Sequence, residues 1–367
     1  MQTEQIISLI NAEIIAFLGH APTAIDSLPA SGSQRRYFRL HFAKNISENS
    51  NKNEYSLIAA YNENIAENQL FIAYTNHFLA QKIAVPMVRH ISPDKKLYFQ
   101  QDLGDISLLS YLDSLENTAR NTAIDSYYKK ALTDLAFIQC NAGKNLDFSL
   151  ANTHTNFDKV VMNWDLSYFK YWFLMPSRIT YDEYRLEQDF QYFLQQLDGA
   201  DTDFFLFRDF QARNIMLKPK DNEPDSFDLY YIDYQGARQG ALSYDVASLL
   251  YQAKANLSDN QRENLFEHYL SAVAALPNSP KIADLRAEYP NYVLLRLLQV
   301  LGSYGFRGFY ERKPHFLASI PYALCNIEQL MQTRASLFAA MPELSSVLSR
   351  IIERFLHGDG VATVLKS

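Results

Sequence analysis

Two short apolar segments interrupt a largely helical pattern in the second half of the chain. They are Phe204–Phe207 (FFLF) and Asp228–Asp233 (DLYYID), and a polar segment that contains prolines separates them. Apolar runs of this length between turn-forming residues are typical of buried strands. Helical periodicity is found on both sides of them, in Ser126–Asn141, Phe157–Leu174, Tyr184–Leu197 and from Asp245 onward. The pattern predicts two paired strands inside a helical domain, each followed by a loop.

Both loops carry acids or amides. Asp209 lies five residues before Asn214 in the sequence RDFQARN, and Asp233 ends the second strand. Phosphoryl transfer needs such a set, because one carboxylate orients and deprotonates the attacking hydroxyl while oxygen ligands hold Mg²⁺ on the phosphates. Any one of these residues alone is equally well explained as a residue that caps a turn. Their order, with strands on both sides, predicts a site.

The beginning of the chain has the pattern of a small sheet. Its strand-like and helical segments are Arg35–Phe42, Tyr55–Tyr61, a helix around Leu70–Leu79, and Leu97–Gln101. A polar hairpin loop at residues 45–54 separates the first two of these strands. The segment Asp102–Asp105 (DLGD) then breaks the last strand before helical sequence begins. We therefore expect a sheet domain at residues 1–101 and a mostly helical domain at residues 102–367.

Three arginines are concentrated in the first of these strands. In an extended strand Arg35 and Arg39 share one face, and Arg36 points to the other. The small turn just before them, with Gly32 and Ser33, would let backbone N–H groups approach phosphates. The arginines are either phosphate-binding cations or solvated strand ends.

Composition excludes several classes of protein. The chain has 367 residues, is 48% hydrophobic and 20% charged, and has a formal net charge of −7. An acidic chain is a poor general binder of nucleic-acid backbones, which clustered lysines and arginines neutralise. Its longest apolar stretches fall short of the roughly 20 residues that a membrane helix needs, and its N-terminus lacks the basic start of a signal peptide. We expect a cytoplasmic protein without nucleic-acid or membrane partners, and the oligomeric state stays open.

The motifs of the two loops resemble those of a known superfamily. Asp209 and Asn214 match the D-x-x-x-x-N catalytic loop of protein-kinase-like phosphotransferases, and Asp233 matches their metal-binding Asp. Within that superfamily, RDFQARN, IDYQGA and YDVASLL resemble the aminoglycoside phosphotransferase family. RRYFR, NWDLSYFKYWFL and LQVLGSYGFRGFYERKPHFL are most similar to the bacterial anomeric kinase that phosphorylates N-acetylmuramate and N-acetylglucosamine in cell-wall recycling. The resemblance implies an α+β, bilobal protein-kinase-like fold with a small antiparallel-sheet N-lobe and a larger, mostly helical C-lobe.

The resemblance also implies roles for individual residues. Asp209 would be the catalytic base, and Asn214 and Asp233 would ligate Mg²⁺ on a bound ATP. Asp245 would brace the catalytic loop. The implied nucleotide-binding residues are Gly32, Ser33, Arg36, Arg39, Gln101 and Leu103, and the implied acceptor-binding residues are Gln211, Arg213, Asp165 and Arg307.

The chain departs from the superfamily pattern at two positions. The third strand, Ser56–Tyr61, lacks the lysine that usually meets the ATP phosphates. We expect Arg36 or Arg39 to supply that charge, which leaves Glu63 and Glu67 as uncertain partners at the start of the helix. Phe207 occupies the position of a His that usually supports the loop. We expect Phe207 to provide this support by packing.

The implied activity is ATP-dependent phosphorylation of a hydroxyl on a small molecule, and the implied acceptor is an amino sugar phosphorylated at its anomeric hydroxyl. An arginine suits a carboxylate such as that of a lactyl ether. Two alternatives stay open. One is a kinase for another acceptor of the aminoglycoside or choline type, and the other is a non-catalytic protein that binds a nucleotide or a partner.

Overall fold

The computed structural model describes residues 2–29, 35–43, 55–150, 154–220, 223–277 and 279–366. The chain forms two compact units. The first contains residues 1–106, 149–152 and 215–235, and the second contains residues 107–148, 153–214 and 236–367. The hairpin that leads to Asp233 therefore groups with the N-terminal sheet, and the helical unit begins at residue 107.

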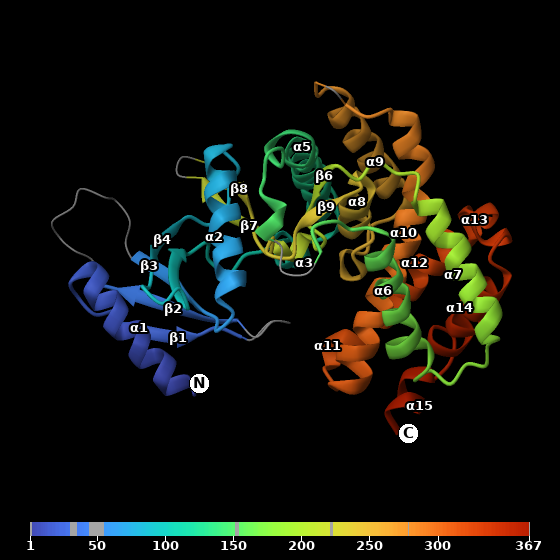
Figure 1. Cartoon of the computed structure of the whole chain (residues 1–367), viewed down its shortest axis with the longest axis horizontal. Helices are drawn as coiled ribbons and strands as arrows, with labels where there is room; N and C mark the ends of the chain where they lie inside the picture. Colours follow the sequence, from blue (N-terminus) through green and yellow to red (C-terminus); the bar gives the residue numbers. More distant parts are fainter. Residues whose placement is uncertain are drawn as a thin grey trace. The chain divides into compact units, whose positions relative to one another are not determined.

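The first unit is built on an antiparallel sheet of five strands in the order β1-β2-β3-β5-β4 (Figure 1). Its elements are α1 (Thr3–Leu18), β1 (Ala24–Ser27), β2 (Arg36–Phe42), β3 (Tyr55–Tyr61), α2 (Ile65–Ala80), β4 (Val88–Ile91), β5 (Leu97–Gln101), β7 (Ile215–Lys220) and β8 (Glu223–Tyr231). Strands β2 and β3 pair from Arg36 opposite Tyr61 to Phe42 opposite Tyr55. This pairing confirms the predicted hairpin, whose loop lies outside the described residues.

One helix covers each face of this sheet. The buried residues Ile6, Ile10 and Ile14 of α1 pack against Phe38 and Phe99. On the other face, Phe71 of α2 stacks on Tyr98 with ring centroids 5.4 Å apart. Because side chains alternate along a strand, Phe38 faces α1 and its neighbours Tyr37 and Arg39 face the side of α2.

The second unit is mostly helical (Figure 1). Its elements are α3 (Leu108–Asp113), α4 (Asn117–Ala123), α5 (Lys129–Phe137), α6 (Lys159–Phe169), α7 (Glu183–Leu197), β6 (Phe204–Leu206), β9 (Arg238–Gly240), α8 (Leu242–Leu250), α9 (Asp259–Ala274), α10 (Ile282–Tyr304), α11 (Pro314–Leu317), α12 (Ile320–Thr333), α13 (Ala335–Ala339), α14 (Pro342–Phe355) and α15 (Gly360–Lys366). Helices α5, α6 and α10 continue into π-helical turns at Ile138–Ala142, Lys170–Leu174 and Gly305–Tyr310. The helices predicted from periodicity are present with slightly different bounds. The helix predicted at Phe157–Leu174 begins at Lys159, and the helix predicted from Asp245 begins at Leu242.

The pairing of the two short apolar strands differs from the prediction. Strand β6 pairs with β9, and β8 pairs with β7, so the two predicted strands do not pair with each other. Sequence periodicity identifies a strand but does not identify its partner, and β9, with three residues, is too short to have a clear pattern of its own.

Two glycines let α10 approach α6 closely. A Cβ at Gly302 would lie 2.8 Å from the backbone nitrogen of Phe169, and one at Gly305 would collide with the carbonyl of Trp172. Only a residue without a Cβ fits there. The sequence LGSYGF therefore fixes the distance between α6 and α10, the helix whose Arg296 reaches the loop that carries Asp209.

Among the described helices, none combines the length and the apolar composition required to cross a bilayer.

Candidate active site

Asp209 lies on a loop whose backbone is held by a buried carboxylate. The Asp245 side chain is fully buried and accepts hydrogen bonds from the backbone N–H groups of Phe207 (2.7 Å) and Arg208 (2.9 Å). Arg208 has a φ of 74°, a left-handed conformation that a residue with a Cβ seldom adopts. Such strain persists only where surrounding contacts enforce it. The prediction that Asp245 braces this loop is confirmed.

The side chain of Arg208 is also held in place. Its Nη2 donates to Asp165 Oδ1 at 2.6 Å, and its guanidinium lies 5.2 Å from the ring centroid of Phe157. Asp165 is buried on α6, and burial raises the pKa of this carboxyl while Arg208 opposes the shift. The pair anchors the residue before Asp209 from a second side.

Arg296 of α10 holds the Asp209 carboxylate directly. Its Nη2 donates to Asp209 Oδ1 at 2.9 Å, and its Nη1 donates to the backbone oxygen of Arg208 at 3.3 Å. The Arg296 side chain is 4% exposed, whereas that of Asp209 is 41% exposed. Burial alone would raise the pKa of Asp209, but the charges of Arg296, Arg213 and Arg208 outweigh it and lower the pKa below its usual value. Asp209 is thus an ionised carboxylate with one oxygen fixed and an accessible edge.

A cavity of about 300 Å³ opens beside Asp209, and it lies entirely within the second unit. Its polar and charged lining consists of Asp209, Gln211, Arg213, Gln252, Lys254, Arg296, Gln299, Ser303, His315 and Ser319. The apolar part comes from Leu109, Val300, Tyr304 and Phe316. A volume of this size holds a small organic molecule.

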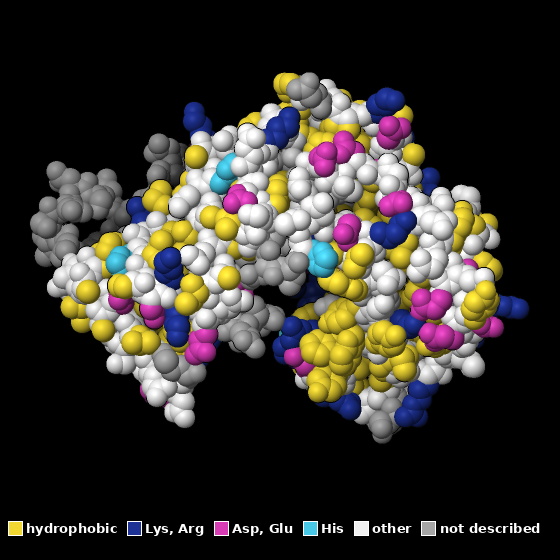
Figure 2. All heavy atoms as spheres, in the orientation of Figure 1, with side chains coloured by type: hydrophobic (Ala, Val, Ile, Leu, Met, Phe, Trp, Pro, Cys, Tyr) yellow, Lys and Arg dark blue, Asp and Glu magenta, His cyan; other side chains and the backbone are white. Residues whose placement is uncertain are grey.

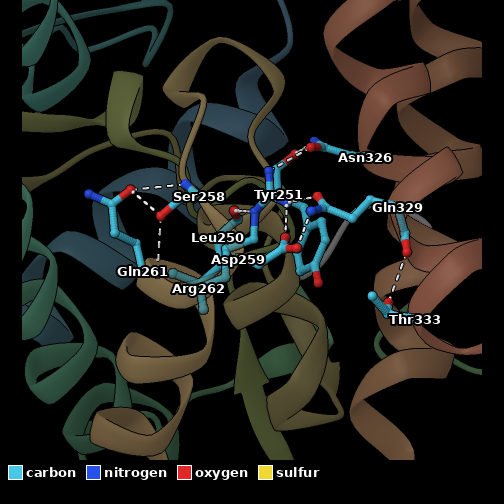
Figure 3. A network of polar contacts seen from close by, with 9 residues as sticks. All are labelled: Leu250, Tyr251, Ser258, Asp259, Gln261, Arg262, Asn326, Gln329 and Thr333. Atoms are coloured by element: carbon cyan, nitrogen blue, oxygen red, sulfur yellow. Dashed lines mark hydrogen bonds and ion pairs between the residues drawn. The ribbon is translucent and has the colours of Figure 1, made fainter.

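A network around Arg262 fixes the cavity wall that carries Gln252 and Lys254 (Figure 3). Arg262 donates to the backbone oxygen of Leu250 (3.2 Å) and to Asn326 Oδ1 (2.5 Å), and its guanidinium lies 4.6 Å from the ring centroid of Tyr251. Gln252 in turn accepts the backbone N–H of Ala212 at 2.7 Å. The turn after α8 is therefore tied both to α12 and to the catalytic loop.

Helix α9, which carries Arg262, begins with a capping box formed by Ser258 and Gln261. The Ser258 hydroxyl accepts the backbone N–H of Gln261 at 3.3 Å, and Gln261 Oε1 accepts the backbone N–H of Ser258 at 2.9 Å (Figure 3). The reciprocal bonds satisfy two donors at the helix start. These bonds fix the residue at which the helix begins. They therefore help to position Arg262 against the turn that carries Gln252 and Lys254.

The four predicted acceptor-binding residues separate into two groups. Gln211 and Arg213 line the cavity. Asp165 pairs with Arg208, and Arg307 pairs with Glu311 at 2.6 Å, so the structure gives these two other partners and places neither in the lining. Acceptor binding by any of the four stays a prediction.

An aromatic cluster accompanies Arg307. The ring of Trp172 contacts those of Phe306 (4.6 Å) and Tyr310 (5.5 Å), and Tyr310 is 69% exposed. Hydrophobic side chains gather on this part of the surface, over α11 and α6 (Figure 2). Trp164 of α6 is 48% exposed, so this side chain is not part of the core.

Asp233 is described within the first unit, where it follows β8. It has a φ of 67°, and its Oδ1 accepts Gln235 Nε2 at 2.7 Å. The next residue, Tyr234, is buried, stacks on Phe71 with centroids 5.0 Å apart, and shares a 2.5 Å hydrogen bond with Thr75. Tyr234 thereby anchors this left-handed turn against α2.

The residues predicted to hold Mg²⁺ have the required chemistry. Asn214 Nδ2 donates to the backbone oxygen of Asp209 at 2.9 Å, which fixes the orientation of the amide relative to Asp209. An amide oxygen and the Asp233 carboxylate are hard oxygen donors of the kind Mg²⁺ prefers, and Mg²⁺ commonly completes its shell with phosphates and water. The donor set fits the ion. Among the described residues, no group of three or more His, Cys, Asp or Glu side chains is arranged as a separate metal site.

The predicted nucleotide-binding residues of the first unit have clear structural contacts. Arg39 donates to Asp102 at 2.7 and 3.2 Å and also to Asp105 at 3.0 Å, and Arg36 donates to Thr3 of α1 at 2.7 Å. Gln101 ends β5 and Leu103 follows it, whereas Gly32 and Ser33 lie outside the described residues. Nucleotide contact by these residues stays a prediction.

Arg35 forms the cation–acid pair that joins the sheet to α2. Its side chain is 0% exposed, and its Nη2 lies 2.9 Å from Glu67 Oε1. Its guanidinium is 5.5 Å from the ring centroid of Phe71. Burial would lower the pKa of Arg35, but Tyr98, Tyr37 and Glu67 raise it, so the buried group stays charged. Of the two acids considered at the start of α2, Glu67 is the one that pairs with Arg35.

Replacing Arg35 should be costly because it would leave Glu67 without its buried partner. We expect Arg35→Met to lower the free energy of unfolding by about 3 kcal/mol, measured by urea denaturation. Arg36→Met, the same change on the opposite face, should cost about 1 kcal/mol or less. A double-mutant cycle with Glu67→Gln should show coupling between the pair. Equal losses for the two arginine variants, or no coupling, would contradict this role.

Sequence reasoning missed several residues of the site. Arg296 and Gln299 are visible in the sequence only as breaks in the apolar run Val293–Val300, and Lys254, Gln252 and His315 have no pattern to mark them. One signal for Arg296 was available. A charged residue on a helix that is apolar on all sides is rarely buried without a partner, so it points to a buried acid.

Comparisons with known proteins agree on the fold. The model of the ecdysteroid kinase-like family matches residues 175–278, which include Asp209, Asn214, Asp233 and Asp245. No curated protein matches the sequence.

Solved structures match over most of the chain. The ADP-bound aminoglycoside phosphotransferase APH(2'')-Ib is 13% identical with a TM-score of 0.53, and the match covers 92% of this chain and 99% of that one. A gentamicin complex of APH(2'')-IIa is 14% identical with a TM-score of 0.54, covering 92% and 98%. An ethanolamine kinase from Plasmodium vivax is 11% identical with a TM-score of 0.53, covering 83% and 82%. The predicted α+β, protein-kinase-like fold is confirmed.

Proposed function

We propose that this chain is a small-molecule kinase that transfers the γ-phosphoryl group of ATP to a hydroxyl of a bound acceptor, with Asp209 as the base. The observation that carries the proposal is the ionised, partly exposed Asp209 carboxylate on a braced loop at the wall of a cavity of about 300 Å³. The fold of solved phosphotransferases, one of them bound to ADP, supports it. The use of ATP as a substrate agrees with the cytoplasmic location that we expect for this protein.

The chemistry follows from the state of Asp209. Its lowered pKa keeps it ionised at neutral pH, so it orients the acceptor hydroxyl by accepting its hydrogen bond and takes the proton as the oxygen attacks. Arg296 occupies Oδ1, which leaves Oδ2 as the acceptor-facing oxygen. Asp245 and Asp165 already hold the loop in place. Little conformational entropy is therefore lost when Asp209 and the acceptor hydroxyl reach the geometry for attack.

Asn214 and Asp233 would ligate Mg²⁺, which when bound neutralises charge on the phosphates. Arg36, Arg39, Gln101 and Leu103, with Gly32 and Ser33, remain the proposed nucleotide contacts. The charge supplied elsewhere by a third-strand lysine is still assigned to Arg36 or Arg39. The buried Arg35–Glu67 pair supplies only the link between sheet and helix.

The metal requirement can be tested at Asp233. Asp233→Ala should abolish most turnover and shift any residual activity to higher Mg²⁺ concentrations, because one of two protein ligands is lost. Asp228→Ala, an exposed acid on the same hairpin, serves as the control and should keep the wild-type Mg²⁺ dependence. The measurement is initial rate against Mg²⁺ concentration. Identical Mg²⁺ curves for wild type and Asp233→Ala would remove Asp233 from the metal site.

For the acceptor we propose an amino sugar such as N-acetylmuramate or N-acetylglucosamine, phosphorylated at its anomeric hydroxyl. This proposal rests on the sequence resemblance in the first strand, α6 and α10, and Gln211 and Arg213 of the cavity would bind the sugar. Exposed aromatics near α6 offer faces on which a sugar can stack. A kinase for another acceptor of the aminoglycoside or choline type is the second candidate, which the names of the solved neighbours favour.

An acceptor panel tests the proposal. The protein is incubated with Mg-ATP and with amino sugars, aminoglycosides, choline and ethanolamine, and phosphorylated products are detected by mass. Phosphorylation of an amino sugar supports the proposal in full. Phosphorylation of another panel member would contradict the amino-sugar acceptor and would still support the kinase activity. No product and no ATP binding would favour a non-catalytic protein.

A further inference from the structure

The cavity beside Asp209 has an unbalanced charge. Of the described residues that line it, Arg213, Lys254 and Arg296 are cationic and Asp209 is the one carboxylate. Arg296 and Asp209 neutralise each other through their 2.9 Å ion pair. Two positive charges are left over in a chain whose net charge is −7.

Those two cations have no counter-ion in the part of the chain that is described. Arg213 and Lys254 are both exposed, and neither forms an ion pair or a hydrogen bond with another described residue. This contrasts with Arg208, Arg262 and Arg296 nearby, which all have acidic or amide partners.

The positive field is also felt by a neighbouring group. His315, which also lines the cavity, has a pKa lowered by burial and by the charges of Lys254, Lys313 and Arg213. Two of these three cations line the cavity itself. A cavity that disfavours the charged form of its own histidine attracts an anion.

The position of Lys254 is built into the fold. The short 3-10 turn Ala253–Ala255 lies between Gln252, which is bonded to the catalytic loop, and the Arg262 network that reaches α12. Arg213 lies on the catalytic loop itself, in the turn Ala212–Asn214. The two cations are therefore held by rigid elements and approach the cavity from two different segments.

We infer that the acceptor carries an anionic group of its own, a carboxylate or a phosphate, which Arg213 and Lys254 bind while its hydroxyl meets Asp209. A planar guanidinium binds a carboxylate or phosphate through paired hydrogen bonds, and a lysine adds a mobile point charge. This inference deepens the proposed function and rests on it. It selects a hydroxy acid, sugar acid or sugar phosphate over a neutral sugar, and it excludes a polycationic acceptor.

The same cations could instead meet the phosphates of ATP. The cavity lies wholly in the second unit, whereas the residues proposed for the nucleotide, including Arg36, Arg39 and Gln101, belong to the first. The lining also includes Ser303, Tyr304 and Ser319, far from the nucleotide residues in sequence. We therefore assign the two charges to the acceptor, and the experiment separates the two possibilities.

The test compares each acidic compound with a neutral counterpart that lacks the acidic group. Binding of N-acetylmuramate and N-acetylglucosamine, of glucuronate and glucose, and of glucose 6-phosphate and glucose is measured by calorimetry on the full chain without nucleotide. We expect at least one acidic member to bind about tenfold or more tightly than its neutral partner, a difference of about 1.4 kcal/mol. Raising the salt concentration should reduce this ratio.

Variants assign the preference to the two cations. Arg213→Gln and Lys254→Gln should each reduce the ratio of acidic to neutral affinity at least fivefold, and Arg213→Lys should restore part of it. Lys281→Gln, which removes an exposed charge outside the cavity lining, should leave the ratio at its wild-type value. The affinity for Mg-ATP, measured separately, should stay within about twofold in the cavity variants.

The outcomes are distinguishable. Equal binding of every acidic and neutral pair, or a ratio that both variants leave unchanged, overturns the inference. Variants that weaken Mg-ATP binding while sparing the acids assign the cations to the nucleotide and also overturn it. Selective acid binding that depends on Arg213 and Lys254, without phosphorylation of any acid, would keep the anion site and remove the proposed kinase activity.

Discussion

Asp209→Asn is expected to reduce turnover by about 10²- to 10⁴-fold, the range that a positioned general base contributes. The amide keeps the shape of the side chain and its carbonyl oxygen can still accept the Arg296 hydrogen bond, but it cannot take a proton. Because the base contacts the acceptor, the affinity for Mg-ATP should change by no more than about twofold. Single-turnover rates and nucleotide binding are the measurements.

The control for Asp209→Asn is Asp198→Asn, which removes an exposed acid paired with Lys159 on the surface of the same unit. It should retain wild-type rates. Loss of nucleotide affinity in Asp209→Asn equal to its loss of rate would indicate a collapsed loop. Wild-type turnover in this variant would remove Asp209 from its assigned role.

Asp245→Asn is expected to have the second largest effect, although Asp245 contacts no substrate. The buried carboxylate accepts the backbone N–H groups of Phe207 and Arg208 with both of its oxygens. An amide has one oxygen, so its NH₂ group must face one of these two donors. We expect the left-handed backbone at Arg208 to relax and to displace Asp209, with a loss of turnover on the order of 10²-fold.

The same variant should change how stability depends on pH. Burial raises the pKa of Asp245 to about 7, although the hydrogen bonds from Phe207 and Arg208 lower it. Between about pH 4 and 7 the folded state then holds a proton that the unfolded state has lost, so stability falls as pH rises through this window. Asn cannot titrate, so the decline should be shallower in Asp245→Asn by up to about 1.4 kcal/mol per pH unit. Urea denaturation at several pH values measures it.

A second buried acid provides the control for that slope. Burial also raises the pKa of Glu288 to about 7, opposed by the hydrogen bond from Ser243. Its contribution stays in Asp245→Asn, so some decline with pH should remain. Parallel pH curves for wild type and Asp245→Asn would show that Asp245 does not titrate in this window.

The catalytic loop could be predicted because its residues are close in sequence. Asp209 and Asn214 lie on one turn, and the structure joins them through the hydrogen bond from Asn214 to the backbone oxygen of Asp209. The strands that flank the loop were evident from short apolar runs. The resemblance to kinase-like phosphotransferases also predicted that Asp245 braces this loop. Its hydrogen bonds with the backbone N–H groups of Phe207 and Arg208 bear this out.

The cavity could not be predicted in this way. Its wall combines Arg213 of the loop, Lys254 of a short turn, Arg296 of α10 and His315 of α11, and no spacing links them in sequence. Their meeting depends on packing, such as the close approach of α10 to α6 at Gly302. Of the residues that line the cavity, the sequence predicted only Asp209, Gln211 and Arg213 as site residues.

Arg35, Arg36 and Arg39 show what the alternation of side chains along a strand cannot predict. Alternation correctly placed Arg36 opposite Arg35 and Arg39, and Arg36 does contact α1. It did not tell which face α2 would cover, and that choice decides which arginine pairs with Glu67. Tertiary packing makes this decision, since both faces of the strand contain apolar residues.

Phosphorus-31 NMR of the protein with Mg-ATP and an acceptor that binds in the calorimetric test examines the central claim most directly. Loss of the γ-phosphate signal with the appearance of a phosphomonoester on the acceptor, in wild type and not in Asp209→Asn, is the result we predict. Intact ATP, or conversion of ATP only to ADP and inorganic phosphate with every acceptor, would contradict it.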